Sequence, residues 1–181
     1  MDINTLLISA QYIKQYSTVG DNVDEAYITP AIIDAQLMGL QPIIGTMLYD
    51  NLCEMASTGT MTEDYQYLLD NYITPYLLNK TQTYLLMNLF AKQRNAGVVQ
   101  YLDTNQQQID ISQVKFLKAE FENKSTFYAQ RMADYLCANS NLFPEYHNRR
   151  DCSDLPSDRK DTYSQQLNFH KYSRTPYQFQ I

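Results

Sequence analysis

The chain has 181 residues, of which 44% are apolar, and a formal net charge of −6 at pH 7. This length suffices for one domain with its own core. The acidic balance disfavours a protein that grips DNA or an anionic membrane through lysine and arginine. With 5 glycines and 6 prolines, the chain lacks the many turns of an all-β protein, and we expect helices.

The first two helices are predicted from capping residues. Ser9 is a suitable N-cap for a short helix through Tyr16, and a longer helix is expected from about Asp24 to Leu40. Pro30 lies either in the first turn of that helix, with Thr29 as its cap, or inside a helix that began earlier.

A corner is predicted in the stretch TPAIIDAQLMGLQPIIGTMLYDNL, residues 29–52. Gly39 and Pro42 are expected to end one helix and start the next, and Gly45 allows two backbones to approach closely. The second helix continues to STGTMT, residues 57–62. In physical terms this is a helix–loop–helix corner at which two apolar faces meet.

The middle of the chain predicts two more helices and an insertion. Thr62 is expected to cap a helix, and Thr74 and Pro75 to start a new one that runs through Arg94. The stretch 95–112 then predicts a short hairpin or an exposed loop, because VVQY favours a strand and TNQQQ a turn. Loops often carry contacts, so this insertion is a candidate interface.

The longest helix is expected from Ser112, as its cap, to about Asn139, and NSNLFPEY ends it at Pro144. Its predicted buried stripe consists of Val114, Leu117, Phe121, Tyr128, Met132, Tyr135 and Leu136. The sequence therefore predicts an all-α bundle of about five helices with a short loop or hairpin insertion and an extended C-terminal arm.

The arm differs from the body in charge. Met1–Tyr146 holds 8 basic and 16 acidic residues, and His147–Ile181 holds 6 and 4, so the net charges are −8 and +2. With only three aliphatic residues, the arm cannot build its own core. Its candidate contact residues are Arg149, Arg150, Arg159, Tyr163, Phe169, Tyr172, Tyr177 and Phe179. Three interpretations stay open: a solvated tail, an arm that docks on an acidic surface such as a neighbouring copy's body, and contact with nucleic acid.

Residues that could carry chemistry are sparse. His147, His170 and three scattered cysteines give no zinc spacing, and the cysteines indicate reduced thiols in a cytosolic setting. No GxxxxGK, GxGxxG or GxSxG motif occurs. The chain start lacks a signal-peptide pattern, and no apolar run is long enough to span a membrane. We therefore expect no catalytic residue, no metal, no cofactor and no membrane partner.

The corner resembles a known family. The pattern is carried by Ile28, Ala31, Ile32, Ala35, Gln36, Pro42, Ile43, Ile44, Gly45, Leu48, Tyr49 and Leu52. It is similar to the first helical hairpin of the head–tail connector, or adaptor, proteins of tailed bacteriophages, particularly crAss-like phages. YITPYLLNKTQTYLL, NAGV and NSNLFPEY add to the resemblance, which covers about residues 9–146. Within the corner, Ile32, Gln36, Pro42, Gly45 and Tyr49 are the expected core residues.

The resemblance implies a structural virion protein without catalytic residues. Such proteins are made in the host cytoplasm. They form a ring, usually of twelve copies, beneath the portal protein, extend the DNA channel and carry the tail or further neck proteins. An acidic lumen would let DNA slide without specific binding. Two alternatives stay open: a small helical interaction module or regulator outside the virion, and an enzyme of unfamiliar type.

Overall fold

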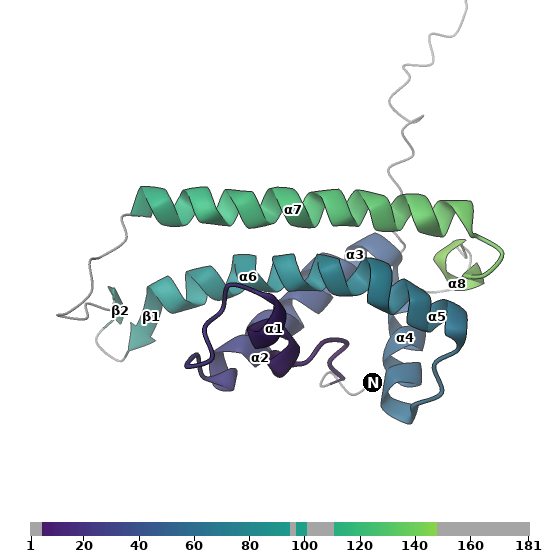
Figure 1. Ribbon diagram of the computed structural model, residues 1–181, viewed down its shortest axis with the longest axis horizontal. Helices are drawn as coiled ribbons and strands as arrows, with labels where there is room; N and C mark the ends of the chain where they lie inside the picture. Colours follow the sequence, from purple (N-terminus) through teal and green to yellow (C-terminus); the bar gives the residue numbers. More distant parts are fainter. Residues whose placement is uncertain (1–4, 95–96, 101–110, 148–181) are drawn as a thin grey trace, which may run out of the picture.

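The computed structural model describes residues 5–94, 97–100 and 111–147, which fold into an all-α body with one short hairpin (Figure 1). The elements are α1 (Ala10–Tyr16), α2 (Glu25–Asp34), η1 (Ala35–Leu40), α3 (Gln41–Ile44), α4 (Thr46–Thr58), α5 (Glu63–Leu68), η2 (Leu69–Ile73), α6 (Thr74–Phe90), β1 (Ala91–Arg94), β2 (Gly97–Gln100), α7 (Ile111–Ala138) and α8 (Pro144–His147). The π-helical segments η1 and η2 each join two α-helices without a break, so the described residues form six helical rods. The predicted all-α bundle is confirmed.

The first two helices begin at side-chain caps. Ser9 caps α1 as predicted, since its Oγ accepts a hydrogen bond from the Tyr12 N–H at 3.1 Å. Asp24 caps α2 through the Ala26 N–H, at 3.0 Å. Pro30 therefore lies inside a helix that began earlier, and Thr29 is not its cap.

Two expected helix breaks are absent. The helix does not end at Gly39 and Pro42, because η1 continues directly into α3. Thr74 is not a fresh cap either, since it has helical dihedral angles of φ −59° and ψ −47°. In both rods the proline follows two residues after the π-helical segment. A proline lacks the N–H that would bond the carbonyl four residues earlier, and a local π turn relieves the clash with that carbonyl without ending the helix.

The break in the corner occurs at Gly45. Its φ of 83° and ψ of 156° are dihedral angles that residues with a Cβ rarely adopt. α4 then runs to Thr58 and ends at Gly59, which has left-handed angles, as STGTMT predicted.

The insertion is a two-stranded antiparallel hairpin in which Lys92 pairs with Val99 and Arg94 with Gly97. The helix expected through Arg94 therefore ends at Phe90, and its last four predicted residues form β1. Pairing with the β-prone Val98 and Val99 outweighs the helical pattern here. Residues 101–110 of the predicted loop lie outside the described residues.

α6 and α7 pack antiparallel along their length (Figure 1). Tyr72 stacks on Tyr135 with ring centroids 4.2 Å apart, and the Lys80 Nζ lies 3.5 Å from the Glu122 carboxylate. Less exposed positions along α7 recur at spacings of 4 and 3, as in a coiled-coil seam: they are Val114, Lys118, Phe121, Ser125, Tyr128, Met132 and Tyr135. Leu117 was wrongly placed in the buried stripe, since it is 38% exposed. Ser112 also does not precede the helix, because α7 begins at Ile111.

Candidate interaction surfaces

The corner residues form one buried unit. Gln36 is 1% exposed, its Oε1 accepts from the Leu7 N–H at 2.9 Å, and its Nε2 donates to the Thr5 carbonyl at 3.1 Å and the Tyr49 Oη at 3.0 Å. Ile32 is fully buried beside this network and Pro42 is half-buried at the start of α3. Gln36 thus joins the N-terminal segment, η1 and α4. The corner therefore positions helices.

Burial raises the pKa values of two side chains in and beside the corner, Tyr49 and Cys53. Desolvation raises the pKa of Tyr49 to about 12, although the hydrogen bond from Gln36 acts in the opposite direction. Desolvation likewise raises the pKa of the neighbouring Cys53 thiol, so it is a poor nucleophile. Tyr49 and Cys53 are thus core residues, and the Tyr49 hydroxyl belongs to the hydrogen-bond network of Gln36.

Acidic residues dominate the first half of the body. Between Gln15 and Asn79 there are nine aspartates and glutamates and no lysine, arginine or histidine. Glu54 on α4 and Glu63, Asp64 and Asp70 around α5 are exposed. A surface of this sign attracts cationic segments and repels nucleic-acid phosphates.

Next to this acidic surface lies a cluster of aromatic rings that we call the tyrosine face: Tyr65, Tyr67, Tyr72, Tyr135 and Phe143. The rings come from α5, η2, the end of α7 and the turn before α8, at one end of the molecule (Figure 1). Tyr67 is 50% exposed and lies within 6.1 Å of both Tyr72 and Tyr135, centroid to centroid. Half-exposed tyrosines are typical of interface residues, because they combine apolar area with a polar tip.

The tyrosine face already binds one guanidinium group. The Cζ of Arg131 lies 4.8 Å from the centroid of the Tyr72 ring, a cation–π distance. Desolvation, with the neighbouring tyrosines and Asp64, raises the pKa of Tyr135, so this phenol stays neutral. The face thus combines neutral aromatic rings with nearby carboxylates, a pairing suited to arginine and lysine.

Hydrogen bonds hold α8 beside the tyrosine face. The Glu145 carboxylate accepts hydrogen bonds from the Asn51 Nδ2 and the Tyr65 Oη, both at 2.8 Å. Desolvation and the bond to Glu145 raise the pKa of Tyr65 well above its usual range. Phe143 is fully buried and packs edge-on against Tyr65 at 5.1 Å. The chain therefore leaves the described body, after His147, next to this face.

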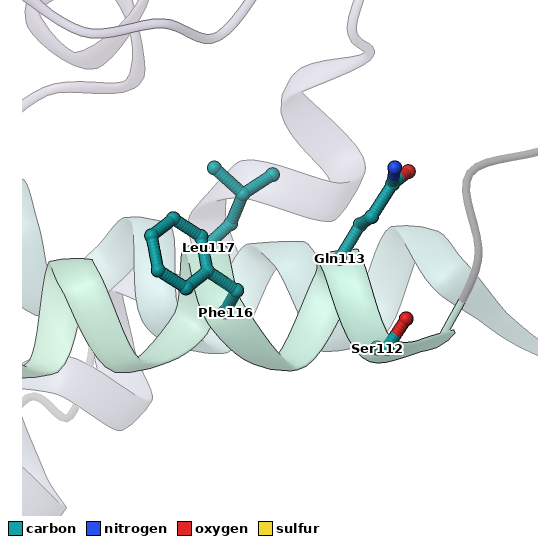
Figure 2. Close-up of a pocket in the computed structure, with 4 residues that line it drawn as sticks. All are labelled: Ser112, Gln113, Phe116 and Leu117. Carbon is teal, nitrogen blue, oxygen red and sulfur yellow. The ribbon is translucent and has the colours of Figure 1, made fainter.

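A second exposed apolar surface lies on α7. Phe116 and Phe127 are 70% and 65% exposed and point to the same side of the helix, since eleven residues make about three turns. Figure 2 shows Gln113, Phe116 and Leu117 at the start of α7, where with Ser112 they line a shallow hollow of about 400 Å³. This helix face adjoins the insertion that the sequence marked as a candidate interface.

The described residues hold no group of three or more histidine, cysteine, aspartate or glutamate side chains that could bind a metal ion. Within the same residues, no helix has both the length and the apolar character needed to cross a membrane. Cys53 and Cys137 are free thiols, the first buried and the second exposed.

The predicted site residues divide into two sets. Of the core-corner residues, Gln36 and Tyr49 are hydrogen-bonded, Ile32 and Gly45 are buried, and Pro42 is half-buried. The arm residues from Arg149 to Phe179 lie outside the described residues. Sequence reasoning missed the tyrosine face as a unit, because Tyr65 and Tyr135 are far apart in the chain. The signal that could have found it is the run of 65 residues without a positive charge, from Gln15 to Asn79, which includes three of its tyrosines.

Comparison with known proteins places the chain in one family. The profile described as "Family of unknown function (DUF6712)" matches residues 40–155, which is more than half of the chain and runs from the end of η1 past α8. The chain therefore belongs to this family. No curated protein and no solved structure matches it.

Proposed function

We propose that this member of the DUF6712 family is a structural virion protein that forms a ring, of twelve copies by the resemblance, at the head–tail neck of a tailed phage. It joins the portal protein to the tail or to further neck proteins and extends the DNA channel. The observation that carries this proposal is the corner of residues 28–52, whose pattern resembles that of head–tail connector proteins.

The geometry supports the proposal in one respect. The residues that carry the resemblance form a single packed unit, in which Gln36 bonds Tyr49 across the turn at Gly45. Two of the residues that carry the resemblance, Gln36 and Tyr49, thus share one buried hydrogen-bond network.

The surfaces also suit an assembly protein. The exposed phenyl rings of α7 are one candidate surface for contacts between copies, and a closed ring needs a second, different face on each copy. The acidic stretch from Gln15 to Asn79 repels phosphate, so DNA could pass a channel lined by it without being held.

Quantitative mass spectrometry of purified phage particles tests the proposal. The chain should be present in a fixed ratio to the portal protein, one to one for a ring of twelve on a twelvefold portal. Complete absence from particles that contain the portal would overturn it and favour a regulator that acts outside the virion.

A further inference from the structure

We propose that residues 162–181 of the arm dock on the tyrosine face of the same copy. This inference does not depend on the neck function, because it concerns one chain and needs neither portal nor ring. It assigns to the tyrosine face an occupant that is part of the protein itself.

Composition matches the segment to the face. Residues 162–181 contain Lys171 and Arg174, no aspartate or glutamate, and five aromatic residues. The tyrosine face offers the half-exposed ring of Tyr67 beside partly buried rings, and the exposed carboxylates of Asp64 and Asp70 lie on the same short stretch of helix. Neither carboxylate takes part in an ion pair with another described residue. The Asp70 carboxylate accepts hydrogen bonds from the Gln66 Nε2 at 2.9 Å, but no described lysine or arginine neutralises its charge. Lysine and arginine side chains of the segment can therefore lie on tyrosine rings and beside carboxylates that have no cationic partner among the described residues.

Arg131 shows that this kind of contact forms on the face. Its guanidinium lies over the Tyr72 ring although Asp134 is only three residues further along the same helix. The ring therefore holds a cation in the described body, and Tyr67, half exposed beside it, offers a second ring of the same type.

The connection favours the chain's own arm over that of a second copy. Phe143, which belongs to the tyrosine face, and Glu145, which bonds to Tyr65, are within four residues of His147, where the described chain ends. Residues 148–161 can then span up to about 45 Å, which is ample to return to a face that begins beside α8. A tether of this length gives an effective concentration in the millimolar range, above that of free subunits in dilute solution.

Photo-crosslinking of the full chain tests the proposal. Phe169 is replaced by p-benzoylphenylalanine, and unlabelled and ¹⁵N-labelled chains are mixed before irradiation. We expect crosslinks from position 169 to peptides of α5 or the end of α7, within light or within heavy chains only. Mixed light–heavy crosslinks in statistical proportion would overturn docking within one copy, and crosslinks to other elements would overturn the choice of face.

Charge variants of the same chain test whether attraction between Asp70 and the cationic residues of the arm contributes to docking. Asp70→Lys should lower the crosslink yield about threefold to tenfold, whereas Asp21→Lys, an equal change at an exposed site near α2, should leave it unchanged. Adding Lys171→Glu and Arg174→Glu to Asp70→Lys should restore the yield. Equal losses in the Asp70 and Asp21 variants would contradict the proposal. Far-UV circular dichroism verifies that each variant is folded. Failure of portal binding leaves these results unaffected, so the two proposals are tested separately.

Discussion

Replacing Gln36 by methionine should destabilise the body, because Gln36 is the central member of the buried hydrogen-bond network in the corner. Methionine keeps the length of the side chain but removes the hydrogen bonds to Leu7, Thr5 and Tyr49. The Leu7 N–H and the Tyr49 Oη are buried and lose a partner, at about 1–3 kcal/mol each, while the half-buried Thr5 carbonyl can bond to water. Burying a thioether in place of an amide returns about 1 kcal/mol. The net loss in the free energy of unfolding should be about 3 kcal/mol.

Urea unfolding followed by far-UV circular dichroism measures this loss. Tyr49→Phe is the matched control, because it removes one of the bonds while Gln36 still donates to Thr5, and it should cost about 1 kcal/mol. In the Gln36→Met background, Tyr49→Phe should cost less than it does alone, since the hydroxyl has already lost the hydrogen bond from Gln36 and keeps only that to Cys53. A loss below 1 kcal/mol for Gln36→Met, or equal losses for the two single variants, would refute the role of Gln36 as the central bond of the corner.

Three further predictions concern backbone conformation, close packing and pH. Gly45→Ala should lower the free energy of unfolding by about 1–3 kcal/mol, because the glycine has φ 83° and ψ 156°. Gly59→Ala should lower it by only about 1 kcal/mol, because Gly59 has φ 67° and an added Cβ would meet open space. Thermal unfolding that gave the reverse order would contradict this interpretation. Gly39→Ala places a Cβ 2.6 Å from the Tyr76 Oη, so it should cost about 1–3 kcal/mol despite its better helix propensity, and adding Tyr76→Phe should recover part of the loss. The pKa of Tyr49 is about 12 in the folded chain against 10 when unfolded, so its contribution to stability is complete below pH 10 and is lost as the pH rises towards 12, by up to about 1.4 kcal/mol per pH unit. The stability difference between wild type and Tyr49→Phe should therefore shrink between pH 10 and 12 in urea titrations, and a constant difference would argue against burial of a protonated phenol.

The sequence predicted those features that depend on neighbouring residues. The cap at Ser9, the end of α4 near Gly59 and the all-α class each follow from local propensity and short patterns, and each is confirmed. Proline misled the prediction twice. Pro42 and Pro75 predict helix starts, but each follows a π-helical segment that accommodates a residue without an N–H, and the rods continue.

Features that depend on tertiary contacts were predicted less well. Leu117 looks like part of a helical stripe, yet antiparallel packing on α6 places Lys118 towards the seam and leaves Leu117 exposed. The tyrosine face needs Tyr65 and Tyr135 from two rods that meet only in the folded body, and no periodicity within one segment indicates that meeting. The corner residues lie within 25 positions, so a turn between two helices could be predicted from one segment, but the break falls at Gly45 and not at Gly39 and Pro42.

Native mass spectrometry tests the central claim most directly. The full chain is mixed at near-physiological salt with the portal protein encoded in the same genome. A complex that contains a fixed number of copies per portal ring, twelve by the resemblance, is the result predicted for a neck ring. A chain that stays monomeric beside an intact portal ring would contradict direct attachment to the portal, and the similarity of the corner would then be one of helical architecture alone.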